Sequence, residues 1–118
     1  MDADHRDLIL GQRCSGRARR KRWARSSPPY TNAPGNPRRG AQFFQTICAV
    51  CHGFDGKAIN FHSADDPEYV GTVAADNPWE ALHKIRFGQP GVGMIALTAL
   101  SMGTLVDILS YAQTLPTK

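Results

Sequence analysis

Two cysteines and a histidine stand within five consecutive residues, and this arrangement constrains the fold more than any other feature of the chain. Cys48 is followed by two residues, then by Cys51 and directly by His52. Apolar residues before the motif recur at helical spacing, which predicts a helix over 38–50. At the end of a helix, two thiols three positions apart lie on one side, and the imidazole that follows projects towards the same face. All three groups can therefore act on one molecule.

The C-x-x-C-H pattern is typical of the attachment site of haem c. Cys48 and Cys51 would form thioether bonds to the two vinyl groups of one haem, and His52 would bind the iron. Two other interpretations stay open at this point. A thioredoxin-like pair normally follows a strand, and no strand is predicted before Cys48. A zinc site needs a fourth ligand at a matching spacing, and the remaining cysteine, Cys14, lies far away in a polar N-terminal segment.

A haem iron bound by His52 needs a sixth ligand or an open position. Four side chains are candidates: Met94, Met102, His62 and His83. Met94 lies in a Gly- and Pro-rich segment, 88–94, where the backbone can turn and direct a thioether inward. Met102 falls at the start of the last predicted helix, where a core role is expected, and His83 is a lone histidine on a helix. The sequence therefore predicts Met94 as the second axial ligand, with Met102 as the main alternative.

Two further helices are predicted from their capping residues. The second begins at the N-cap Asn77, has Pro78 in its first turn and Glu80 as a capping partner, and ends at Gly88. Its predicted apolar face is Trp79, Leu82 and Ile85. The third begins near Ser101 and ends before Pro116, and its apolar positions are Leu105, Ile108, Leu109, Ala112 and Leu115. Residues 53–76, between the first two helices, are predicted to be a long loop.

Charge divides the chain into two parts. Residues 1–39 hold ten basic and three acidic side chains, a net charge of +7, whereas residues 40–118 have a net charge of −3. We predict a disordered basic arm over 1–37 and one folded domain over 38–118. The basic cluster 17–25 has a single interleaved aromatic residue and no recognition fold, so no nucleic-acid partner is expected. No apolar run reaches the ~18–20 residues that span a membrane.

Further residues extend the pattern around the C-x-x-C-H motif into a family resemblance. Gly40 and Phe44 precede Cys48 at intervals of four, Tyr111 lies in the last predicted helix, and residues 85–94 lead to Met94. In this pattern residues 38–118 resemble a class I c-type cytochrome, a monohaem protein. The resemblance implies an all-α fold with three main helices around one covalently bound haem c. It also implies that Gly40, Phe44 and Tyr111 meet where the first and last helices cross.

The function implied is that of a one-electron carrier between redox partner proteins, without catalysis of its own. The alternative is an electron-accepting haem c subunit of a dehydrogenase or oxidase complex. A gas sensor or a peroxidase-like activity would require a vacant sixth position on the iron. The family matures outside the cytoplasm, so a periplasmic or otherwise extracytoplasmic location is expected. No export signal is legible in residues 1–37, where the longest early apolar run is 8–10.

Overall fold

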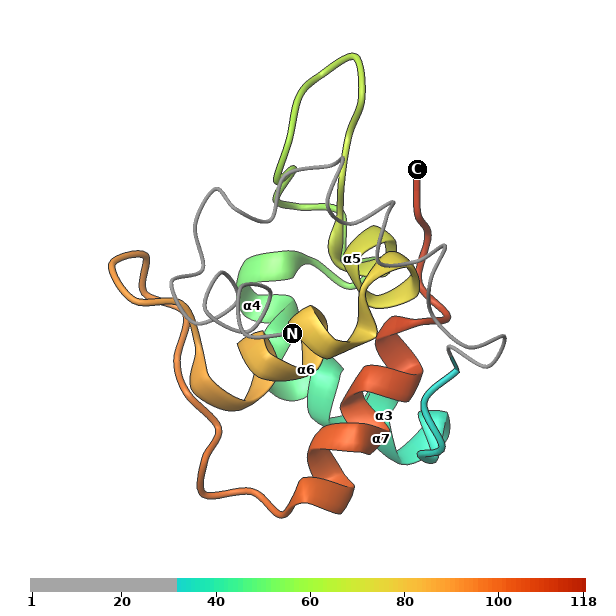
Figure 1. Cartoon of the computed structure of the whole chain (residues 1–118), viewed down its shortest axis with the longest axis vertical. Helices are drawn as coiled ribbons and strands as arrows, with labels where there is room; N and C mark the ends of the chain where they lie inside the picture. Colours follow the sequence, from blue (N-terminus) through green and yellow to red (C-terminus); the bar gives the residue numbers. More distant parts are fainter. Residues whose placement is uncertain (1–31) are drawn as a thin grey trace, which may run out of the picture.

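The structure, a computed structural model, describes residues 32–118 of the 118-residue chain. Cys14 and the basic cluster 17–25 lie outside the described residues, so the interpretations placed on them stay predictions. The described part is helical and has no strand beyond an isolated bridge between Gln89 and Met94, so it confirms the all-α class (Figure 1). Its elements in chain order are α3 (Pro37–Phe43), the π-helical segment η2 (Phe44–Cys48), α4 (Ala49–His52), α5 (Val70–Asp76), α6 (Pro78–Phe87) and α7 (Met102–Ala112).

Polar side chains begin three of these helices at the predicted places. Asn36 accepts hydrogen bonds from two backbone N–H groups of α3, Asn77 accepts one from Glu80 at 3.2 Å, and Ser101 accepts one from Thr104 at 3.2 Å. Each cap satisfies backbone donors that have no partner inside the helix. The prediction that residues 53–76 form one loop is wrong at its end, because α5 occupies the last part.

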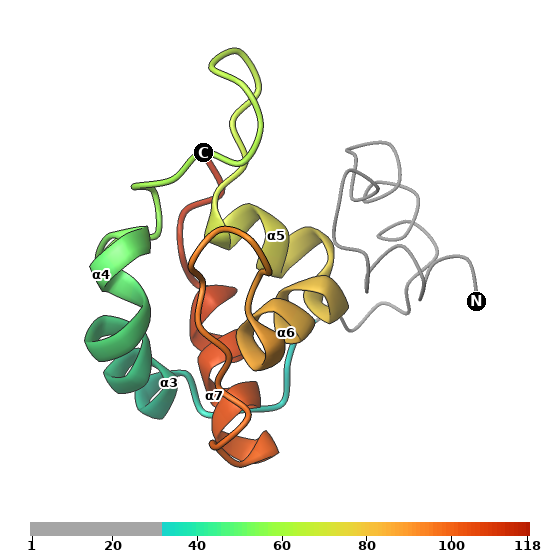
Figure 2. The same ribbon diagram turned by 90° about the vertical axis from the view of Figure 1, so that its left-hand side faces the viewer.

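The first and last helices cross at direct backbone contact. A Cβ atom on Gly40 would lie 1.9 Å from the carbonyl oxygen of Asp107, so only glycine fits this position of α3. Beside the contact, Phe44 is 2% exposed, and its ring centroid lies 5.4 Å from that of Tyr111. The predicted meeting of Gly40, Phe44 and Tyr111 is therefore confirmed, and Figure 2 shows α3 alongside α7.

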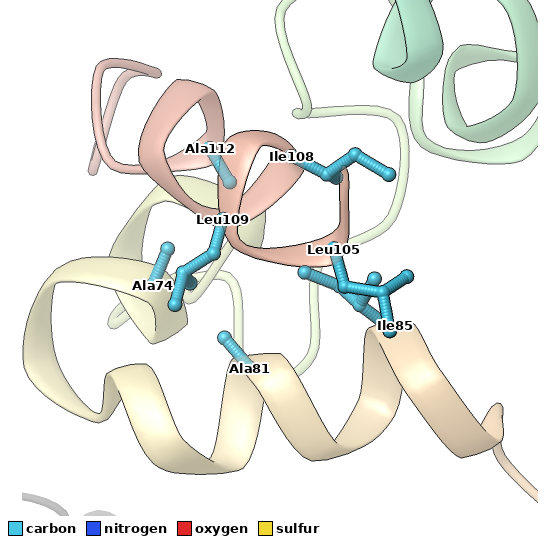
Figure 3. Packing of buried hydrophobic residues seen from close by; sticks show 7 residues of the cluster. All are labelled: Ala74, Ala81, Ile85, Leu105, Ile108, Leu109 and Ala112. Atoms are coloured by element: carbon cyan, nitrogen blue, oxygen red, sulfur yellow. The ribbon is translucent and has the colours of Figure 1, made fainter. Parts of the chain in front are cut away.

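The hydrophobic core lies where α7 packs on α5 and α6. Ala81 and Ile85 project from α6 towards α7, and Ala74 reaches the same side of α7 from α5 (Figure 3). The buried cluster is Ala74, Ala81, Ile85, Leu105, Ile108, Leu109 and Ala112. The predicted apolar face of α6 is wrong at Trp79, whose side chain is 60% exposed. Trp79 precedes Ala81 by two residues, which places it roughly on the opposite side of the helix.

The segment that precedes α3 is held along α7 by side chains spaced three residues apart. Its bonds are Ala33 N–H to Gln113 Oε1 at 2.7 Å, Gly35 N–H to Ser110 Oγ at 2.9 Å and Asn36 N–H to Asp107 Oδ1 at 2.7 Å. Residues 33–37 thus belong to the folded part, although the sequence analysis placed them in the arm. No helix in residues 32–118 is long and apolar enough to cross a membrane.

Candidate functional site

The helical run that carries the motif is continuous from α3 to α4, but its winding changes in the middle. Ala49 donates its backbone N–H to the carbonyl of Phe44, five residues earlier, so η2 is a π-helical turn. The Thr46 hydroxyl donates to the carbonyl of Gln42 at 2.7 Å, a bond of the kind that bends helices. Such turns hold more residues than an α-helical turn and are frequent at functional sites. This turn rotates the motif side chains relative to the face that packs on α7.

The two cysteines of the motif have different surroundings. Both are free thiols, and Cys51 is exposed while Cys48 is half-buried. Burial raises the pKa of the Cys48 thiol to about 11, so at neutral pH this thiol is almost entirely protonated. Thiol–disulfide exchange of the thioredoxin type needs an activated thiolate. The thioredoxin-like interpretation gains no support from this thiol or from the helix that precedes it.

His52 is the last residue of α4 and is half-buried. Burial lowers the pKa of His52 below its ordinary value, so the imidazole is neutral at pH 7, the form in which histidine binds metals. Its Nδ1 atom is buried and has no hydrogen-bond partner. The ring of Phe61 meets the imidazole edge-on, with 6.0 Å between the ring centroids. Gly53, at φ +84°, ends the helix directly after His52.

Gln45 supports the motif in a way that the sequence analysis missed. Its amide donates to the Tyr111 hydroxyl at 2.8 Å and to the carbonyl of Phe54 at 3.0 Å. It therefore ties the π-helical turn to α7 and to the segment that follows His52. No local pattern could have identified Gln45, because Tyr111 lies 66 residues away in the sequence.

Met94 lies at the end of a short hairpin that follows α6. Gln89 donates its N–H to the carbonyl of Met94 at 3.3 Å, and Val92 donates to the carbonyl of Gln89 at 3.4 Å. Pro90 followed by Gly91 at φ +86° is typical of a type II turn. The Met94 side chain is half-buried. The backbone of this residue is thus held by the hairpin, as the Gly- and Pro-rich sequence predicted.

The other three candidates for the sixth ligand have different positions. Met102 is the first residue of α7 and is 44% exposed, so the core role expected for it is not observed. His62 is exposed and its Nδ1 lies 2.9 Å from the carbonyl oxygen of Asp66. His83 is half-buried on α6 with its ring centroid 5.0 Å from that of Phe87. Of the three, only His62 lies in a chain reversal, which is closed by hydrogen bonds from Phe61 N–H to the carbonyl of Glu68 at 2.7 Å and from Ser63 N–H to the carbonyl of Asp66 at 3.4 Å.

The predicted site residues come from two separate parts of the fold. Cys48, Cys51 and His52 are brought together on one stretch of helix, whereas Met94 lies on the hairpin after α6, with no hydrogen bond between the two. Among residues 32–118, no three His, Cys, Asp or Glu side chains are grouped to hold a metal ion. The zinc interpretation, which needs four such ligands, therefore gains no support in the described part. In a haem the iron is already coordinated by four ring nitrogens, so the protein has to supply at most two ligands.

Large apolar side chains stay exposed around the motif. Val50 and Phe54 are among the most exposed of these, at 82% and 77%, and Ile59 and Phe61 in the following loop are also exposed. Several exposed apolar side chains close to one motif are typical of a surface that binds something.

Comparisons with known proteins found no relative of this chain. No protein-family model, curated protein or solved structure matches the chain significantly. The functional assignment therefore depends on the residues themselves.

Proposed function

We propose that the folded part is a monohaem cytochrome c domain that carries one electron between redox partner proteins. Cys48 and Cys51 would hold haem c covalently, and His52 and Met94 would be its axial ligands. The C-x-x-C-H sequence at the end of a helix is the single observation that carries the proposal. The crossing of α3 and α7 at Gly40 supports it, because this packing was expected from the family resemblance alone.

The residues of the site suit a covalently attached haem. Partial burial lowers the pKa of His52, which favours the neutral imidazole, the form that binds iron. The exposed apolar side chains of Val50, Phe54 and Phe61 offer apolar surface to a large planar ligand. A domain of this size has a modest core, and a haem fixed at two thiols would add apolar contact area to it.

Each residue has a distinct task in the proposed carrier. When bound, the haem supplies an iron centre that gains and loses one electron reversibly. Cys48, at the end of η2, and Cys51, in α4, would fix the group to this helical run, so it would stay attached through repeated cycles. The thioether of Met94 would favour the reduced state more than a nitrogen ligand would. Because His52 and Met94 would fill both axial positions, no position would be left for a substrate, and we propose a carrier rather than an enzyme.

Attachment of haem to two thiols requires maturation, and by family resemblance this takes place outside the cytoplasm. We therefore propose a periplasmic or otherwise extracytoplasmic location. An absorption spectrum of the purified reduced protein, with its pyridine haemochrome, tests the function. We expect the haemochrome of haem c and a one-electron redox titration. Carbon monoxide binding to the reduced protein would contradict two filled axial positions, and stable co-elution with a second chain would favour the subunit of a larger complex.

A further inference from the structure

α6 presents aromatic side chains on the side away from the core. Trp79, His83 and Phe87 follow one another at intervals of four residues, so they lie within about 80° of the helix surface. Trp79 is 60% exposed and Phe87 is 48% exposed, and the ring centroid of His83 lies 5.0 Å from that of Phe87. Ala81 and Ile85 project from α6 towards α7 (Figure 3), so these rings lie on the outward side. We call Trp79, His83 and Phe87 the α6 aromatic face.

The charge beside this face is positive. Glu80, the acidic residue of α6, is buried. Arg86 is exposed, and its guanidinium lies over the Phe87 ring, 5.0 Å from the centroid. Arg86 follows Trp79 by seven residues, about two helical turns, so it lies almost in line with Trp79 along the helix. A ligand that suits this face therefore combines apolar side chains with carboxylates.

The first residues of this chain have that composition. Three carboxylates and one arginine give residues 2–10 a net charge of −2. An apolar run, 8–10, follows the last carboxylate directly. Residues 11–39, in contrast, hold nine basic and no acidic side chains. Residues 2–10 are therefore the part of the N-terminal region whose charge complements Arg86. The carboxylates are Asp2, Asp4 and Asp7, and the apolar run is Leu8, Ile9 and Leu10.

The described part of the chain begins close to α6. The Gln113 side chain accepts a hydrogen bond from the backbone N–H of Ala33 at 2.7 Å and donates one to the carbonyl of Ala74 at 3.1 Å. Ala74 lies in the last turn of α5, four residues before α6 begins. The 22 residues of 11–32 can extend to about 70 Å, whereas α6 is only about 15 Å long. Residues 2–10 can therefore reach any point along α6.

We propose that residues 2–10 dock on the α6 aromatic face of the same molecule. The apolar run of this segment packs on Trp79 and Phe87, and its carboxylates lie beside Arg86. The contact removes apolar surface on both sides from water, and the charges at its edge orient the segment. Because one chain links the two sides, a contact too weak to hold two molecules together suffices. The proposal does not rest on the proposed function, since this face contains none of the proposed haem ligands.

The indole N–H signal of Trp79 in a proton–nitrogen NMR spectrum tests the docking. The chain has two tryptophans, so the substitution Trp23→Phe leaves a single indole signal. In this background, a variant that lacks residues 2–10 gives the undocked position of the signal. A synthetic peptide of residues 1–12, added to that variant until the signal stops moving, gives the docked position. All samples are measured in the reduced state.

We expect the signal of the full chain to lie about midway between the two reference positions. The contact involves only a few side chains, so docked and undocked molecules should be present in similar numbers. Docking at this level stabilises the folded chain by only about 0.4 kcal/mol, which is RT ln 2. The position of the signal should not depend on protein concentration, because the contact forms within one molecule.

Substitutions on either side of the contact should move the signal towards the undocked position. Leu8→Ser/Leu10→Ser should lower the ratio of docked to undocked molecules about tenfold, because buried apolar area is lost. Arg86→Ala should lower this ratio about two- to fivefold, since an exposed ion pair contributes little. Tyr30→Ser and Val92→Ser are the matched controls, because they remove apolar side chains outside the segment and outside the face. Both should leave the ratio unchanged. Each variant is compared with its own truncated form.

Three results would overturn the proposal. The first is a full-chain signal at the undocked position. The second is a signal whose position changes with protein concentration, because a second copy of the chain would then be the occupant. The third is an equal effect of Leu8→Ser/Leu10→Ser and of Tyr30→Ser. The readout requires no electron transfer, so each result stands whether or not the proposed function holds.

Discussion

Replacement of Phe44 by alanine measures how far the helix crossing stabilises the domain. Phe44 is 2% exposed and its ring packs on that of Tyr111. Truncation of a buried phenylalanine costs about 3–5 kcal/mol, because apolar contact is lost and a cavity remains. For a domain of this size each kcal/mol lowers Tm by about 4–8 °C. A loss of about 4 kcal/mol therefore corresponds to a fall in Tm of about 15–30 °C.

The assay is denaturant and thermal unfolding of the purified protein, followed by circular dichroism. Trp79→Ala is the control, because it removes a large aromatic side chain from a position on α6 that is 60% exposed; its free energy of unfolding should change by less than about 0.5 kcal/mol. A double-mutant cycle with Tyr111→Leu isolates the ring pair, for which we expect a coupling of about 0.5–1.5 kcal/mol. Similar midpoints for Phe44→Ala and Trp79→Ala would refute the packing described for α3 and α7.

Further substitutions test separate parts of the account. Gly40→Ala should destabilise the protein by about 1–3 kcal/mol in thermal unfolding, since its Cβ would lie 1.9 Å from Asp107 O. Gly103→Ala should instead stabilise by up to about 1 kcal/mol, because its Cβ meets nothing closer than 3.9 Å; the same sign for both would contradict the close crossing. Asp107→Ala should lower the free energy of unfolding by about 1–3 kcal/mol. It should also speed amide exchange at Asn36, because the Asp107 carboxylate accepts a hydrogen bond from the Asn36 N–H. Arg39→Ala, at the exposed end of the ion pair with Asp107, should cost less than about 1 kcal/mol. Met94→Ala should open the iron to carbon monoxide and abolish the thioether-to-iron absorption band; loss of that band in Met102→Ala instead would assign the ligand to Met102.

Local signals in the sequence predicted the helix ends well. The caps at Asn36, Asn77 and Ser101 depend on side chains that bond to backbone groups two or three residues away, so the sequence alone contains the relevant partners. The crossing at Gly40 was also predictable, but only through the resemblance to a known family, since its partner Asp107 lies far along the chain.

Features that depend on tertiary contacts were missed. α5 has a weak start signal, because Tyr69 and not a typical cap residue precedes it. Trp79 is exposed because α6 packs on α7 through Ala81 and Ile85. Helical periodicity alone did not show which side of α6 faces the core. The bond between Gln45 and Tyr111 joins residues that no local pattern connects. The choice of the sixth ligand also depends on tertiary structure. The sequence shows that residues 88–94 can turn, but the position of the Met94 thioether depends on how this segment packs.

The mass of the denatured chain tests the central claim most directly. The full chain is produced behind a bacterial export signal together with a cytochrome c maturation system, purified, and unfolded in acid before mass spectrometry. We predict that the chain retains the mass of one haem, that this mass survives acid–acetone extraction, and that the double variant Cys48→Ser/Cys51→Ser loses it. A chain that matures under these conditions without retaining haem, or whose haem is extracted by acid–acetone, would contradict covalent attachment at Cys48 and Cys51.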